Sequence, residues 1–355
     1  MNQKREINKR KKKTGKSIKK SCELQDIRGS LMGTFLSILF LLVLLSALFI
    51  LIYILYMNIP GEVQQGNVQV GSSSTDEKLA LSAVKQFYSN TKFNHNVILY
   101  EMDVNCDEQK KKRIMDAFGI VSEKVNKLTF KESFNNGVDI VISCSEESKE
   151  NIDEEHFIAG EGGAKEIVQT GKYNVINEGI IYLYESQDFK TAKCNYPDVE
   201  LHELMHVFGF QHSEDKSSLM YPYLESCNQV LDDSIIDELN RLYSEENLAD
   251  LFFEDVWTVK RGRYLDFNLT IKNSGVVNAL DVHYSIIDDG ELVETRKLDE
   301  EVSDISYGAG IIISISNLRL LNRNSKEISF ILDKRDDIKE LDEDNNIAIA
   351  RFGIN

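Results

Sequence analysis

Three histidines and one glutamate near the middle of the chain have types and spacing suited to metal chemistry. His202 and His206 are four residues apart, so on a helix both imidazoles project from one face and can reach one ion. Glu203 lies beside them, where its carboxylate can reach a water held by that ion. Gly209 permits a left-handed turn that ends the helix, and that turn lets His212 supply a third nitrogen.

Three protein ligands leave one tetrahedral position for water, which is typical of catalytic zinc. Zinc lowers the pKa of such a water to about 7, and Glu203 is placed to take the proton. Glu225 is an alternative third ligand, because some HExxH sites use a glutamate well downstream. The spacing of His212 after Gly209 favours the histidine. The sequence therefore predicts a hydrolytic zinc centre with Glu203 as general base.

A methionine, Met220, follows His212 by eight residues in the run Leu219-Met220-Tyr221-Pro222. The HExxHxxGxxH pattern with this methionine resembles the metzincin metallopeptidases, and His212-Ser213 with the methionine run is most similar to the matrixin branch. The resemblance covers roughly residues 94–245, and 231–243 resembles the helix that closes the matrixin domain. The resemblance implies peptide hydrolysis, with His202, His206 and His212 as the zinc ligands and Glu203 as the base. It also implies that Met220 forms the floor beneath the metal and that the strand near Gly163–Val168 lies along the substrate.

The matrixin resemblance has further consequences and some departures. It places Cys106 and Cys144 after neighbouring strands and Cys194 and Cys227 on either side of the metal motif, which favours those two disulfides among three connectivities. Cys22 is expected to stay unpaired. We find no cysteine-switch propeptide, so latency by the family route is not expected. Structural calcium is left open, since carboxylate and carbonyl ligands leave weak signatures.

The amino-terminal region has the pattern of a membrane anchor. Leu31–Met57 contains 27 residues without a charge and as a helix would be roughly 40 Å long, enough to cross a bilayer. Residues 1–30 carry eleven Lys/Arg and three Asp/Glu, and positive flanks stay cytoplasmic. We therefore predict a single-pass membrane protein with a cytoplasmic amino terminus and an extracellular catalytic domain. A cleaved signal peptide is the alternative, but its apolar region would be shorter.

Between anchor and carboxyl terminus the sequence predicts three parts. Residues 58–93 are interpreted as a stalk or linker, because 61–75 are rich in Gly, Ser and Gln. Residues 94–248 are predicted to form an α+β domain, a mixed twisted sheet with helices. The expected strands of this domain are 97–102, 138–143, 166–170 and 179–184. Its expected helices are 107–128, the metal motif with Asp198 as its cap, and 233–243. Residues 160–164 are expected to be a loop.

The last part, residues 249–355, is predicted to be an all-β, Ig-like sandwich of six or seven short strands. Thr270–Gly275 and Asp333–Asn346 resemble the cell-adhesion-related CARDB domain of microbial surface proteins. We expect residues 250–355 to fold alone, to be dispensable for cleaving short peptides, and to offer a surface for a cell-surface or envelope ligand.

Charge and composition narrow the function classes. The formal net charge is −17; because residues 1–30 contribute +8, the remainder carries −25, which argues against nucleic-acid binding. The leading interpretation is a zinc endopeptidase with a polypeptide substrate. The alternative is an adhesion or scaffold protein with a catalytically weak enzyme domain.

Overall fold

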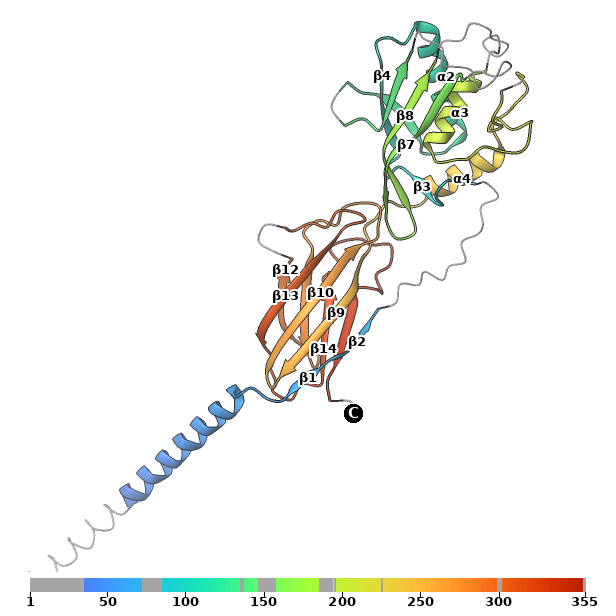
Figure 1. Ribbon diagram of the computed structural model, residues 1–355. Helices are drawn as coiled ribbons and strands as arrows, with labels where there is room; N and C mark the ends of the chain where they lie inside the picture. Colours follow the sequence, from blue (N-terminus) through green and yellow to red (C-terminus); the bar gives the residue numbers. More distant parts are fainter. Residues whose placement is uncertain are drawn as a thin grey trace, which may run out of the picture. The chain divides into compact units, whose positions relative to one another are not determined.

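The computed structural model describes residues 35–71, 85–134, 137–145, 158–184, 194, 196–224, 226–298 and 302–353 (Figure 1). The predicted basic tail, the unpaired Cys22 and the alternative ligand Glu225 lie outside the described residues. One helix, Phe35–Asn58, contains no charged residue, and its side chains are almost all exposed. By length and composition this helix is able to cross a membrane.

The α+β region that contains the metal motif is built on a mixed sheet, as the sequence predicts. Its parallel strands lie in the order β3-β8-β6-β4-β5, and β7 adds to β8 in the antiparallel direction. The bounds are β3 Thr91–Lys92, β4 Val97–Met102, β5 Thr129–Glu132, β6 Ile140–Cys144, β7 Gly160–Gln169 and β8 Asn174–Leu183.

The loop expected at residues 160–164 is wrong, because these residues begin β7. This segment pairs with β8 from Gly160↔Leu183 to Ala164↔Gly179, and the register then shifts on both sides of Glu166. Gly160 and Gly162 serve close packing rather than a turn. An added β-carbon at Gly162 would stand 2.2 Å from the carbonyl oxygen of Glu203, so only glycine lets the strand lie this close to the metal-motif helix.

Three helices complete this α+β region: α2 Glu108–Lys124, α3 Asp198–Val207 and α4 Asp233–Ser244. The side chain of Asp107 caps α2 by accepting a hydrogen bond from the Lys110 N–H at 2.8 Å. The predicted cap Asp198 is wrong: Pro197 is the cap residue, and Asp198 is the first helical residue, fully buried. A common core joins helices and sheet through side chains such as Ile98, Phe118, Ile142, Leu204 and Leu239.

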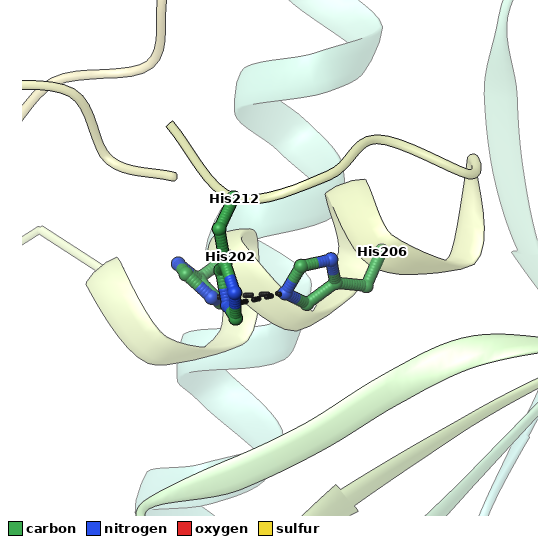
Figure 2. A group of neighbouring side chains, drawn as sticks. All are labelled: His202, His206 and His212. Atoms are coloured by element: carbon green, nitrogen blue, oxygen red, sulfur yellow. Dashed lines mark hydrogen bonds between the residues drawn. The ribbon is translucent and has the colours of Figure 1, made fainter. Parts of the chain in front are cut away.

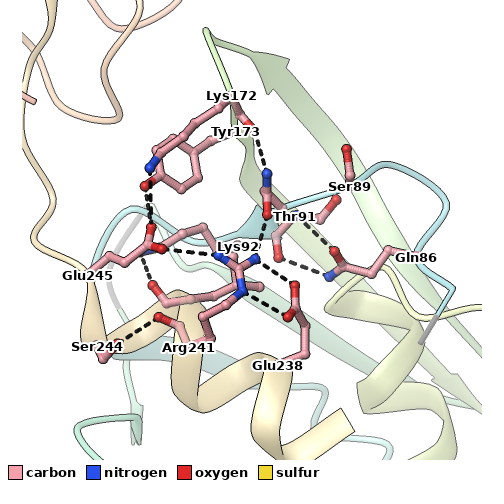
Figure 3. A network of polar contacts seen from close by, with 12 residues as sticks. Gln86, Ser89, Thr91, Lys92, Lys172, Tyr173, Glu238, Arg241, Ser244 and Glu245 are labelled. Atoms are coloured by element: carbon pink, nitrogen blue, oxygen red, sulfur yellow. Dashed lines mark hydrogen bonds and ion pairs between the residues drawn. The ribbon is translucent and has the colours of Figure 1, made fainter. Parts of the chain in front are cut away.

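A buried lysine connects β3 to the end of α4 (Figure 3). The Lys92 ammonium donates to the Leu242 carbonyl at 2.6 Å and to Asn247 Oδ1 at 2.9 Å, and it lies 5.3 Å from the centre of the Tyr243 ring. Burial lowers the pKa of Lys92 to about 8. The carbonyls at the carboxyl end of a helix carry partial negative charge, which favours a cation at this position.

The carboxyl-terminal region is all-β, as predicted, and forms two sheets around one core. The sheets have the orders β1-β9-β10-β13 and β12-β11-β14-β15-β2. Apart from β1 and β2, the bounds are β9 Leu251–Arg261, β10 Tyr264–Asn273, β11 His283–Asp288, β12 Glu291–Lys297, β13 Gly310–Arg319, β14 Glu327–Leu332 and β15 Ile347–Arg351. The sequence reading missed β12, whose residues are mostly exposed.

Part of the expected stalk belongs to these carboxyl-terminal sheets. β1 (Val63–Gln65) pairs with β9, and β2 (Asn67–Val70) pairs antiparallel with β15 from Ala348↔Val70 to Arg351↔Asn67. Val68 packs against the core of the two sheets. The α+β region is therefore inserted between the second and third strands of this all-β fold, and residues 250–355 lack two of its strands.

Both predicted disulfides are present. Cys106–Cys144 links the segment after β4 to the end of β6. Cys194–Cys227 links the segment before α3 to the chain that follows the methionine run.

Candidate metal centre

The structure brings the three histidines of the motif together (Figure 2). His202 and His206 project from α3, and His212 follows the turn after that helix. His206 Nε2 lies 3.1 Å from His202 Nε2 and 3.1 Å from His212 Nε2. Among the described residues, this is the only group of three or more His, Cys, Asp or Glu side chains close enough to hold one ion.

The outer nitrogens of two of these rings fix which nitrogen faces inward. His202 Nδ1 lies 2.7 Å from the Leu219 carbonyl oxygen, and His206 Nδ1 lies 2.7 Å from that of Phe210. A carbonyl only accepts, so each Nδ1 carries the hydrogen and each Nε2 has a free lone pair. Two lone pairs facing each other at 3.1 Å repel unless a cation lies between them. These residues therefore fit a zinc ion, whose bonds to histidine nitrogen are about 2.0–2.1 Å.

Burial keeps the imidazoles uncharged. It lowers the pKa of His202 to about 3, and the neighbouring His206 acts in the same direction. Burial also lowers the pKa values of His206 and His212. Neutral imidazole is the form that binds metal, so the chain prepares the ligands without further deprotonation at neutral pH.

Gly209 makes the turn that the sequence predicts. Its φ of +83° is in the left-handed region, and its N–H donates to the His206 carbonyl at 3.0 Å. The sequence reading missed a segment that holds this turn from outside. The Gln86 side chain donates to the Phe208 carbonyl at 3.1 Å, and the Phe87 N–H donates to the Gly209 carbonyl at 2.8 Å. Only tertiary contacts reveal this role, because Gln86 is over 100 residues away in the sequence.

Met220 lies in the turn expected beneath the metal and is 1% exposed. Its carbonyl accepts a hydrogen bond from the Ser213 N–H at 2.7 Å, directly after the third histidine. The neighbouring Leu219 supplies the carbonyl that orients His202. The methionine run therefore orients the His202 ring directly, and it also fixes the backbone next to His212.

Glu203, on α3, is 7% exposed, and its side chain lies against the beginning of β7. The Gly162 N–H donates a hydrogen bond to its carboxylate. Burial, with the charge of Glu161 in second place, raises the pKa of Glu203 to about 8 in the metal-free chain. A bound cation acts in the opposite direction, since positive charge favours the carboxylate.

An arginine that the sequence reading did not single out holds the start of α3. Arg113, on α2, donates to Glu200 Oε1 at 2.9 Å and to the carbonyls of Cys194 and Tyr196 at 3.0 and 3.1 Å. Together with the Cys194–Cys227 disulfide, these bonds fix the segment that enters the metal-motif helix.

The comparisons with known proteins agree with both halves of this architecture. Residues 87–244 match the family model for Matrixin, and residues 249–350 match that for CARDB. Similar solved structures include a crystal structure of a CARDB domain from Pyrococcus furiosus in complex with di-metal ions and a solution structure of that domain. Each shares 12% identity with this chain and has a TM-score of 0.22. Each match covers 30% of this chain, and it covers 88% of the chain in the crystal structure and 95% of the chain in the solution structure.

No curated protein matches the chain. The matches divide the described fold at the boundary between α4 and β9. Residues 87–244, called the peptidase region from here on, are thus similar to the Matrixin family, and residues 249–350, called the CARDB region, are similar to the CARDB family.

Proposed function

We propose that this protein is a membrane-anchored zinc endopeptidase that acts outside the cytoplasm. The observation that carries the proposal is the convergence of three imidazole Nε2 atoms, two of which have their Nδ1 atoms bonded to backbone carbonyls. This arrangement suits a zinc ion with an open position, and the matrixin match supports a metallopeptidase.

In this proposal His202, His206 and His212 hold zinc, which supplies a Lewis acid for the peptide carbonyl and acidifies water. Glu203 performs the proton transfers. Its carboxylate takes a proton from the attacking water and returns it to the departing amine nitrogen, which cannot leave as an anion. The Gly162 N–H, which donates to this carboxylate, orients it.

The substrate is proposed to be an extended polypeptide. Within the described part of the chain, β7 pairs with β8 alone, so its other edge has no partner strand there. An extended peptide can add to such an edge as a further strand. Because Gly160 and Gly162 lie against Glu203, a peptide on this edge passes the proposed base.

The anchoring half of the proposal rests on the helix Phe35–Asn58 and on the basic residues before it. The positive-inside rule places those residues in the cytoplasm and the peptidase outside. Protease added to intact cells should degrade the peptidase region, whereas complete protection until lysis would refute this orientation. A mature protein that begins after residue 58 would instead indicate a cleaved signal sequence.

The decisive experiment uses the full-length protein in detergent. Zinc content is measured together with cleavage of a quenched-peptide library, before and after treatment with a chelator and after zinc is added back. We expect stoichiometric zinc and cleavage that is lost and restored with the metal. Zinc binding without any cleavage would favour the adhesion or scaffold alternative, and a protein that binds no zinc would refute the proposal.

A further inference from the structure

The strand that borders the metal centre, β7, has two differently supported halves. Its first half lies against α3, where Gly160 and Gly162 contact Glu203. The register shifts on both sides of Glu166 separate this half from Ile167–Gln169. The second half is paired with β8 from Ile167↔Ile176 to Gln169↔Asn174, and beyond this pairing it has support from outside the sheet of the peptidase region.

The carboxyl-terminal sheets supply that support through the loop before β13. An added β-carbon at Gly308 would stand 2.6 Å from Val168 Cγ1 and 3.0 Å from the Gln169 carbonyl oxygen, so this backbone lies directly against β7. Tyr307, the preceding residue, donates its hydroxyl hydrogen to Asn177 Oδ1 on β8 at 2.7 Å.

A second contact holds the turn between β7 and β8. The Gly171 N–H donates to the Ser274 carbonyl at 2.9 Å. Beside it, Tyr173, Val175 and Val276 form a small apolar cluster in which each residue is at most 2% exposed. This cluster is separate from the two large cores, so the contact between peptidase and CARDB regions has an apolar centre of its own.

We propose that the CARDB region holds the second half of β7 in position to bind the part of a peptide substrate remote from the scissile bond, with Val276 and Gly308 as positioning residues. The inference rests on the proposed function, in which the free edge of β7 binds substrate. A peptide that reaches Ile167–Gln169 gains backbone hydrogen bonds only if this segment stays extended and in place, since a mobile strand must be ordered at the moment of binding.

The inference separates short from long substrates. β7 has ten residues and therefore spans about 34 Å, whereas a hexapeptide covers about 20 Å. A hexapeptide bound at the first half does not reach the supported half. Loss of the support should then raise KM for an extended peptide without changing kcat, and it should leave both constants for the hexapeptide unchanged. General damage to the fold does not produce this pattern.

The test compares matched glycine and loop variants of the full-length protein. Gly308→Ala places a methyl group against Val168, whereas Gly290→Ala imposes a similar positive-φ strain (φ +90° against +71°) where nothing lies within 4 Å. Val276→Asp puts a charge into the apolar cluster, whereas Leu280→Asp puts the same charge at a side chain that is 60% exposed. The second pair keeps the test valid if Gly308→Ala fails to fold.

Each variant is assayed on a hexapeptide that the wild type cleaves and on two longer peptides. One of these carries five further residues at the amino end of the hexapeptide, and the other carries five at its carboxyl end. We expect wild type to cleave one extended version with a KM about tenfold lower, the worth of one or two hydrogen bonds. Gly308→Ala and Val276→Asp should lose that gain, and their controls should keep it. Hydrogen exchange at 166–173 should be faster in the same two variants only.

The outcomes separate the two proposals. If wild type cleaves peptides but both test variants keep the gain and the slow exchange, the positioning role is wrong and the peptidase proposal stands. An equal loss on short and long peptides would show a general structural effect and would also overturn the role. If wild type cleaves none of the peptides despite bound zinc, the proposed function fails and the substrate role fails with it.

Discussion

The backbone of Gly162 lies directly against that of Glu203, close enough that a β-carbon at residue 162 would stand 2.2 Å from the Glu203 carbonyl oxygen. The Gly162 N–H also donates to the Glu203 carboxylate. One residue thus sets both the distance between β7 and α3 and the orientation of the proposed base. A displaced strand should therefore impair catalysis more than it impairs folding.

Gly162→Ala tests this relationship, and Gly163→Ala is its matched control because nothing lies within 4 Å of a β-carbon at Gly163. We expect Gly162→Ala to lower kcat/KM about 100-fold, since a misplacement of about 1 Å has effects of that order. Gly163→Ala should stay close to wild type. Equal activities of the two variants in a quenched-peptide assay, with zinc content unchanged, would show that this contact is not needed.

Glu203→Gln and His206→Ala should fail in different ways. Glu203→Gln removes the group that transfers protons but none of the three imidazoles, so we expect bound zinc with kcat lowered about 10²–10⁴-fold. His206→Ala removes the ring whose Nε2 lies 3.1 Å from both other Nε2 atoms, so zinc itself should be lost. Metal analysis alongside peptide turnover distinguishes the two. Near-normal turnover by Glu203→Gln would remove Glu203 from the mechanism.

Glu340 should make the stability of the CARDB region depend on pH. Burial raises its pKa to about 8, although the Leu251 N–H and the Asn346 side chain donate to it. Between about pH 4.5 and 8 the folded state then binds a proton that the unfolded state has lost. The free energy of unfolding should fall as pH rises through this window, by at most about 1.4 kcal/mol per unit, and level off above it.

Urea unfolding followed by fluorescence measures this slope, because Trp257, on β9, is the one tryptophan of the chain. Glu340→Gln should flatten the decline, whereas Glu291→Gln, exposed on β12, should leave it unchanged. An identical decline in all three proteins would assign the effect to other groups.

The segment before the peptidase region should stabilise the CARDB region. A fragment of residues 249–353 lacks β1 and β2, so it exposes the edges of β9 and β15 and loses the packing of Val68. We expect its free energy of unfolding to be roughly 2 kcal/mol or more below that of the same region in the full chain.

A peptide of residues 61–71 should restore part of this stability in a concentration-dependent way, because it binds only the folded fragment. The same peptide with Val68→Asp is the control and should have no effect. A fragment as stable as the intact protein, with no response to the peptide, would show that β1 and β2 are dispensable.

The sequence by itself determined the local features of this protein. The spacing of His202, His206 and His212 around Gly209 predicted a site whose atoms the structure brings together, because a helical turn and a left-handed glycine are local constraints. Strand β4 and helix α4 were found nearly to the residue, since their apolar periodicity is a local signal too. The mixed sheet followed from the order of the strand and helix patterns, and the disulfide pairs from the matrixin resemblance.

Only the tertiary structure decided which distant segments meet. Glycines usually mark turns, so the sequence predicts a loop at Gly160–Ala164, but Gly160 and Gly162 instead allow β7 to approach Glu203. β1 and β2 are three and four residues long and mostly exposed, so no periodic signal marks them, and their pairing with β9 and β15 spans most of the chain. Such pairing depends on complementary edges and on packing such as that of Val68, which are properties of the assembled fold.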